Sequence, residues 1–254
     1  MSHILEKVGL VLLLPAFCSA QSLAPSDALN RYLARSRDRQ PACSDLVLAV
    51  QIDASLPKLR KQGTMRGLKR VSQTGQIVYR SLRFTGDNFV KTAVTARFLA
   101  EEEEPRTGAA DYAVTERNYS LVYEKTSDYN GMTAYVFRLK PRRKRVGLLR
   151  GELWLDANTA APLRLWGDFV KSPSVYIRSF RLVQDYQNLG ACSLPLRLLL
   201  MVQTRIVGKV EIAVWLHPAD GQPATKGTAA RGSDSDATQG FAHSSIQEKD
   251  GMTQ

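Results

Sequence analysis

Histidine is the side chain most often used as a general base and as a metal ligand, and this chain contains three. They are His3, His217 and His243, at or beyond the two ends of the segment in which the sequence predicts a folded body. This distribution removes histidine-based triads, dyads and metal sites from the predicted body. The sequence also contains no Walker A loop, GxGxxG, GxSxG or CxxC motif. We therefore predict no catalytic residue, cofactor or metal site.

One four-residue segment matches a known catalytic sequence motif. Ser55–Leu56–Pro57–Lys58 fits the SxxK pattern, in which a serine nucleophile and a lysine lie one helical turn apart. Pro57 disfavours a helical conformation at Leu56, and the SDN and KTG partner motifs are missing from the sequence. We therefore do not expect a penicillin-recognising active site.

The densest cluster of charge lies in residues 138–150, which contain seven basic residues and no acidic one. The cluster covers a predicted strand end and hairpin turn, so several cations share one rim. Two interpretations stay open: a solvated turn, and a surface that docks phosphate, anionic head groups or a membrane partner. The candidate docking residues are Lys140, Arg142, Arg143, Lys144 and Arg145.

The first 20 residues have the composition of a cleavable secretory signal. A polar start containing Lys7 is followed by an apolar run from Val8 to Phe17 and by small residues before Gln21. The apolar run has about half the length that a membrane-spanning helix needs. We expect a protein exported to the periplasm, either free or at a membrane surface, where a nucleic-acid partner is not expected.

Removal of the signal takes Cys18 away and leaves Cys43 and Cys192. In an oxidising compartment these two cysteines could form a disulfide that closes a very long loop, or they could remain separate buried thiols. Sequence gives no distance between them, so both alternatives stay open.

The chain of 254 residues is 44% hydrophobic, enough for one folded domain with a sizeable core. A helix is predicted within 21–40, followed by strands at 46–52, 63–71 and 76–84. Asp87 is predicted to cap a second helix with Val90, Val94 and Phe98 on one face. We expect the acidic run 101–104 at its end to be a solvated face, because carboxylates there oppose the helix dipole.

From Tyr119 onward, apolar side chains alternate with a period of two, which is typical of strands. About ten strands joined by short turns predict one antiparallel sheet. The clearest stripes are Tyr119, Leu121 and Tyr123; Tyr135, Phe137 and Leu139; and a longer run from Leu196 to Ile206. We predict a domain over 21–216 and a disordered polar tail over 217–254.

Three segments resemble one known family. They are Ala134–Pro141, then Gly151–Glu–Leu–Trp–Leu–Asp156, then Ala161–Pro–Leu–Arg–Leu165. Together they are similar to a hairpin of the LolA-like superfamily, which includes the outer-membrane lipoprotein-sorting carrier, its receptor and the N-terminal domain of RseB. Ala160 and Ala161 stand in the turn where that family usually has a glycine.

The resemblance implies a mainly β, α+β fold: a strongly curved antiparallel sheet that forms an incomplete half-barrel with helices covering its concave face. It also implies an apolar concave side, where acyl chains bind in the sorting carrier. The stripe residues Tyr119, Leu121, Tyr123, Tyr135, Phe137 and Leu139 are candidates for the lining, and plain core is the alternative.

Three functional hypotheses follow from the sequence. The first is a non-enzymatic periplasmic protein that binds or carries a lipid or an acylated lipoprotein, with the cationic rim facing head groups or an envelope membrane protein. The second is a sensor or scaffold module that binds a protein partner, as in the N-terminal domain of RseB. The third is an enzyme on the same fold. The sequence does not specify the oligomeric state.

Overall fold

The computed structural model describes residues 22–37, 46–72, 76–103, 113–189 and 192–219. The predicted signal 1–20 and nearly all of the predicted tail 217–254 lie outside these ranges, as does Cys43.

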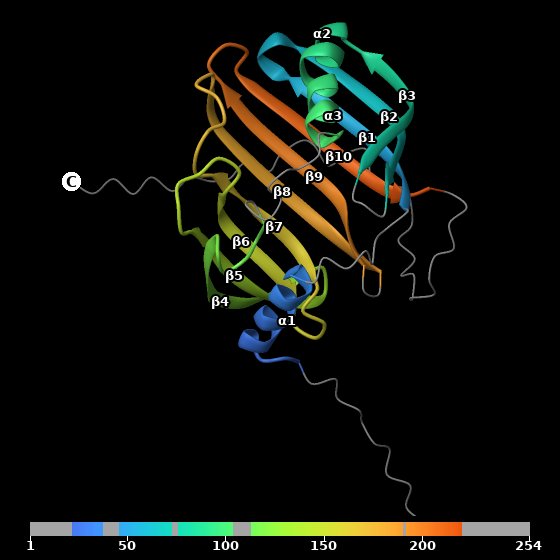
Figure 1. Ribbon diagram of the computed structural model, residues 1–254. Helices are drawn as coiled ribbons and strands as arrows, with labels where there is room; N and C mark the ends of the chain where they lie inside the picture. The colour runs from blue at the N-terminus through green and yellow to red at the C-terminus, as the bar shows by residue number, and fades with distance from the viewer. Residues whose placement is uncertain (1–21, 38–45, 73–75, 104–112, 190–191, 220–254) are drawn as a thin grey trace, which may run out of the picture. The chain divides into compact units, whose positions relative to one another are not determined.

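Ten antiparallel strands form one sheet in the order β3-β2-β1-β10-β9-β8-β7-β6-β5-β4 (Figure 1). The strands are β1 Leu46–Leu56, β2 Lys61–Val71, β3 Ile77–Gly86, β4 Tyr119–Tyr129, β5 Met132–Pro141, β6 Leu149–Asp156, β7 Pro162–Phe169, β8 Ile177–Leu189, β9 Cys192–Thr204 and β10 Lys209–Pro218. β3 and β4 are the two edges, so the sheet is open. The predicted fold class, a mainly β curved sheet that does not close, is confirmed.

Alternation of side chains along each strand gives the sheet two different faces. In β1 every second residue from Leu48 to Leu56 is buried, and its neighbours are half-buried. Residues that lie opposite one another on neighbouring strands share a face of the sheet. Ala54 lies opposite Ile212, Ile212 lies opposite Leu200, and Leu200 lies opposite Leu182, so all four belong to one face. We call the face that bears these residues the inner face.

A pair of glycines marks the close approach of β6 and β7. Gly151 lies opposite Gly167, and a Cβ atom added to Gly151 would lie 1.9 Å from the carbonyl oxygen of Trp166. Any side chain here would force the two strands apart, so these glycines permit the local geometry of the sheet.

Two helical segments pack on the inner face. Helix α1, Pro25–Arg37, covers the part formed by β5 and β6, where Ala28 is fully buried against Phe137 and Leu155. The second segment consists of α2 Asn88–Val90, a π-helical turn Lys91–Thr95 and α3 Ala96–Glu103. It covers β1, β2, β9 and β10 with Val90, Val94 and Phe98 (Figure 1).

The second segment begins and ends with polar contacts. Asp87 caps its first turn by accepting hydrogen bonds from the backbone N–H groups of Phe89 and Val90, as predicted. At the far end Glu102 forms an ion pair of 2.7 Å with Lys69 and accepts a hydrogen bond from the Tyr79 hydroxyl. The prediction of a solvated acidic run is therefore wrong for Glu102, because a cation of β2 lies beneath the helix.

The predicted elements are otherwise confirmed with shifted boundaries: β1 extends to Leu56, beyond the predicted 46–52, and β9 begins at Cys192, before the predicted Leu196. β9 ends at Thr204, and Ile206 lies in the turn before β10, where its side chain is exposed. β10 continues to Pro218, past the predicted domain end at 216, because Ala49 and Leu48 of β1 pair with His217 and Pro218. The pairing of β10 with β1 thus extends beyond the point where the alternation of apolar residues in the sequence ends. The 3₁₀ turn η1, Pro57–Leu59, joins β1 to β2.

Candidate functional site

The middle of the inner face bears an apolar strip that the helices do not fully cover. Phe180 and Leu182 of β8 and Leu198 and Val202 of β9 are only half-buried, although their neighbour Leu200 is buried. Leu182 contacts both the cluster beneath α1 and the cluster beneath the second helical segment. The strip, defined as Phe180, Leu182, Leu198 and Val202, thus lies between the two covered parts of the sheet.

The stripe residues predicted as lining lie mostly elsewhere. Tyr119, Tyr135, Phe137 and Leu139 are buried in the cluster that contains Ala28 of α1. Leu121 is half-buried at the border of that cluster.

The two buried tyrosines among these residues are also hydrogen-bonded. The Tyr135 hydroxyl donates to the carbonyl oxygen of Leu23 at 2.5 Å, and the Tyr119 hydroxyl accepts from the N–H of Leu149 at 3.2 Å. Tyr123 is 43% exposed, and its ring lies edge-on to those of Tyr135 and Phe137. Helix and sheet atoms thus surround most of the predicted lining.

The cationic cluster partly encloses an open hollow of about 460 Å³. Of the five predicted docking residues, Arg142, Arg143 and Lys144 line it, whereas Lys140 and Arg145 do not. The other lining residues are Pro141, Arg150, Asp168, Phe169 and Val170.

Two of the lining side chains are held by protein groups. The Nε of Arg142 donates to the carbonyl oxygens of Glu116 and Tyr119, at 2.8 and 3.2 Å. Asp168 accepts two hydrogen bonds from Arg181, at 2.8 and 3.0 Å. Because its acid is already paired, the hollow presents a surplus of positive charge.

An aromatic stack connects the strip to this hollow. The rings of Phe169 and Phe180 are stacked with centroids 4.4 Å apart and an interplanar angle of 18°. Phe169 lines the hollow and Phe180 belongs to the strip. The Phe169 ring thus extends the strip to the end of β7, where the hollow lies, although Arg150 and Asp168 of the hollow belong to the outer face of the sheet.

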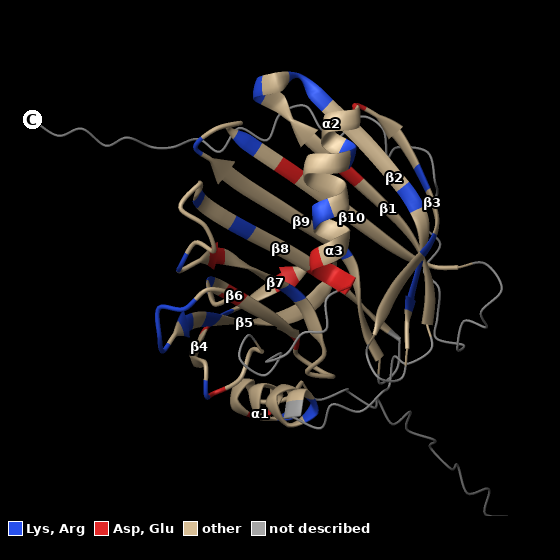
Figure 2. Cartoon of the chain, turned by 45° about the horizontal axis from the view of Figure 1, so that its top comes forward, with Lys and Arg blue, Asp and Glu red and all other residues tan. Residues whose placement is uncertain are grey.

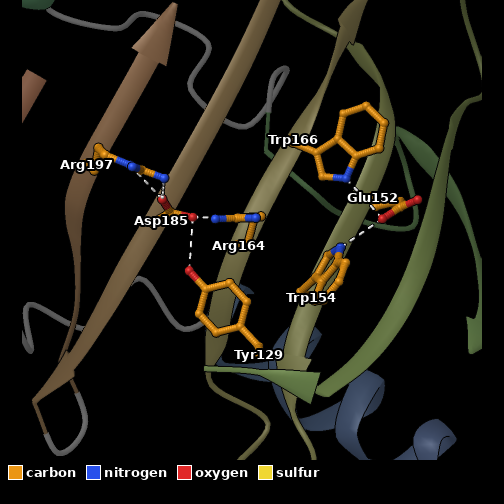
Figure 3. Close-up of polar contacts among 7 residues, drawn as sticks. All are labelled: Tyr129, Glu152, Trp154, Arg164, Trp166, Asp185 and Arg197. Atoms are coloured by element: carbon orange, nitrogen blue, oxygen red, sulfur yellow. Dashed lines mark hydrogen bonds and ion pairs between the residues drawn. The ribbon is translucent and has the colours of Figure 1, made fainter. Parts of the chain in front are cut away.

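The opposite, outer face bears a polar network (Figure 3). Asp185 accepts hydrogen bonds from Arg164 Nε at 2.6 Å, Arg197 Nε at 2.9 Å and the Tyr129 hydroxyl at 3.0 Å. Burial alone would raise the pKa of Asp185, but the hydrogen bonds and charges of the two arginines hold it below its usual value. A carboxylate fixed in its ionised form suits cross-strand pairing better than proton transfer.

Two tryptophans extend this network. The indole N–H groups of Trp154 and Trp166 donate to the same oxygen of Glu152, at 2.8 and 3.0 Å (Figure 3). Arg164 also lies over the Tyr129 ring. No local sequence pattern reveals this network, because its members come from five strands and only the register brings them together.

Four further features bear on the predictions from the sequence. Ser55 of the SxxK string lies in β1, not in a helix, and its hydroxyl donates to Glu211 at 3.1 Å. Cys192 is disulfide-bonded, whereas Cys43, one candidate for its partner, lies outside the described residues. Among the residues with described positions, no three His, Cys, Asp or Glu side chains are grouped as metal ligands. None of the helices described is both long and apolar enough to cross a membrane.

An open, curved antiparallel sheet with a helix-covered apolar face defines the architecture. No protein-family model matches the chain, and no curated protein matches it by sequence. Among solved structures it is similar to a LolA superfamily protein from Nitrosomonas europaea, with 13% identity and a TM-score of 0.33, covering 78% of this chain and 97% of that one.

Two further solved structures resemble it. A DUF1329 family protein from Desulfovibrio piger has 11% identity and a TM-score of 0.36, with 79% and 95% coverage. The MucA/MucB complex of Pseudomonas aeruginosa gives 12% identity and a TM-score of 0.25, with 78% and 94% coverage. The resemblance to LolA-like proteins expected from the sequence is thus confirmed among the structural matches. Identities and TM-scores this low do not transfer a ligand or a partner.

Proposed function

We propose that this protein is an exported, non-enzymatic binding protein for an anionic acylated molecule, a lipid or a lipoprotein. The observation that carries the proposal is the half-exposed apolar strip, which the Phe169–Phe180 stack extends to the end of the sheet where the cationic hollow lies. Each methylene buried on such a strip stabilises a complex by about 0.8 kcal/mol, so useful affinity needs shape and no catalytic group.

The inner-face strip is tested by a pair of adjacent leucines. Leu198 faces inward in the strip, and Leu199, also half-buried, faces outward on the same strand. With a fluorescent fatty acid as probe, we expect Leu198→Asn to weaken binding about tenfold, since it removes apolar contact worth about 1.5 kcal/mol. Leu199→Asn is the control and should bind like the wild type. Equal losses in both variants, or no uptake by the wild type, would contradict the proposal.

The charge of the head group is tested separately. Replacing Arg143 and Lys144 by Gln should weaken binding of the fatty acid anion and leave binding of the corresponding fatty alcohol unchanged. Native mass spectrometry of protein purified from the periplasm should show bound acyl species. Protein sequencing should find Gln21 as the first residue if the predicted signal is cleaved.

The outer face favours one alternative, a scaffold or sensor that binds a protein partner. Half-buried Trp154, Trp166 and Trp215 lie on this face with Tyr129 and two arginines, a composition enriched at protein interfaces. A partner from envelope extracts that is lost with Trp166→Ala, while fatty acid uptake persists, would favour this alternative. Retention of the partner by that variant would count against it.

A further inference from the structure

The hairpin turns divide between the two ends of the sheet. In an antiparallel sheet successive turns alternate ends, so β1–β2, β5–β6, β7–β8 and β9–β10 all turn at one end. The residues in these four turns, 57–60, 142–148, 170–176 and 205–208, include no Asp or Glu. They include eight cations: Lys58, Arg60, Arg142, Arg143, Lys144, Arg145, Lys171 and Arg205. We call this the cationic end; its basic residues line the strand ends in Figure 2.

Large apolar side chains project from two of these turns. Val175, Tyr176 and Ile206 are 77%, 59% and 68% exposed. The backbone N–H of Arg205 donates to the carbonyl oxygen of Tyr176, and its Nε donates to that of Val175, both at 2.8 Å. The β7–β8 and β9–β10 turns are therefore tied together, so their apolar tips form one patch, which we call the tip patch.

Single exposed apolar side chains are common and need no function. The tip patch differs because three such side chains from two turns are held together, and the four turns of this end carry eight cations and no Asp or Glu. A protein partner would require a complementary acidic and apolar surface, whereas an anionic bilayer offers both features at any point.

We propose that the cationic end docks on an anionic phospholipid bilayer. Val175, Tyr176 and Ile206 enter the interfacial region, and the cations of the four turns contact lipid phosphates. A tyrosine suits this depth because its ring is apolar and its hydroxyl remains in contact with water. This inference goes beyond the proposed function, since it concerns the surface from which a ligand would be taken or to which it would be delivered.

Vesicle sedimentation tests the apolar part. We expect the protein to bind phosphatidylcholine vesicles containing about 30% phosphatidylglycerol and to release them at about 0.5 M salt. The double variant Val175→Ser/Ile206→Ser should lower the partition coefficient about tenfold. Its matched control is Val122→Ser/Leu82→Ser, which removes two exposed apolar side chains, 57% and 46% exposed, from the edge strands. The control should bind like the wild type.

A second pair of variants tests the charges. Lys58→Gln/Lys171→Gln should weaken binding to the anionic vesicles about tenfold. Arg31→Gln/Lys125→Gln removes the same net charge from exposed positions outside the cationic end and should have little effect. All these residues are exposed, so unchanged thermal unfolding is expected and confirms that each variant is folded.

The outcomes separate docking from ligand uptake. Loss of vesicle binding in the tip variant, with fatty acid uptake retained, supports docking. Equal effects of the tip and control variants, or equal binding to pure phosphatidylcholine vesicles, would overturn it while leaving the proposed ligand site intact. Failure of the Leu198 test with normal vesicle binding would instead overturn only the proposed function.

Discussion

The two ends of the sheet contrast in charge and in the contacts that hold them. The links at the end opposite the cationic end, 72–76, 130–131, 157–161 and 190–191, contain no charged residue in the sequence. The described contacts of that uncharged end are internal: Leu23 N–H donates to the carbonyl oxygen of Ala157, and Arg35 donates to that of Thr159.

Two of the five buried polar residues described, Lys69 and Asp156, lie toward the uncharged end. The Lys69–Glu102 pair joins β2 to the last turn of α3, Asp156 is buried beside its turn, and Cys192 is disulfide-bonded at the start of β9. The comparison teaches that α1 and the last turn of α3 are held at the uncharged end, whereas Asp87 holds the start of α2 at the cationic end, whose turns display their cations. Substitutions at the uncharged end should therefore affect stability, and those at the cationic end should affect binding.

The largest expected effect is at Lys69. Lys69→Met keeps the length of the side chain but leaves the Glu102 carboxylate buried without its cation, which should cost about 3–5 kcal/mol of unfolding free energy. Chemical denaturation measures this cost. The double variant Lys69→Met/Glu102→Leu should lose much less, because no unpaired charge remains. Arg143→Met, an exposed substitution at the cationic end, should stay within about 0.5 kcal/mol of the wild type. Similar losses of stability for Lys69→Met and Arg143→Met would contradict the inferred difference between the two ends of the sheet.

An intermediate effect is expected at Asp156. Its Oδ1 accepts hydrogen bonds from the Asn158 and Thr159 N–H groups at 2.9 and 2.7 Å and from the Thr159 hydroxyl at 2.9 Å. Asp156→Ala would leave these donors without their acceptor, and we expect a loss of about 2 kcal/mol in denaturation. Vesicle binding by the folded variant should not change. A variant with wild-type stability would show that the uncharged end is not fixed by this turn.

The smallest effect is expected at Ala160, which has a left-handed φ of 58°. Ala160→Gly relieves backbone strain of about 1–2 kcal/mol. It also removes a fully buried methyl group worth about 0.8 kcal/mol and adds freedom to the unfolded chain. These opposing contributions nearly cancel, so the free energy of unfolding, followed by thermal unfolding, should change by less than about 1 kcal/mol. A large stabilisation would mean that strain dominates at this turn.

The sequence predicted the elements well where periodicity was clear. Alternation identified the strands, and Asp87 with the Val90, Val94 and Phe98 stripe identified the second helix correctly. The solvated acidic run was wrong because Lys69 precedes Glu102 by 33 residues, and no local pattern reveals such a partner. The family's usual glycine position was informative, since Ala160 adopts the left-handed conformation that glycine favours.

The candidate site was predictable only in part. The run of basic residues predicted a cationic rim, and four of its seven members line the hollow. The half-exposed strip was missed because its side chains look like ordinary core residues in the sequence. Their exposure depends on how far each helix reaches across the sheet, which is a property of packing.

By itself the sequence determined the alternating strands, the amphipathic second helix, the excess of positive charge and a candidate export signal, because each is a local pattern of side chains. Tertiary structure alone decided which turns share an end, which apolar stripe stays half-exposed and which carboxylate meets a buried lysine. Those features depend on strand order and register, which bring together residues that lie far apart in the chain.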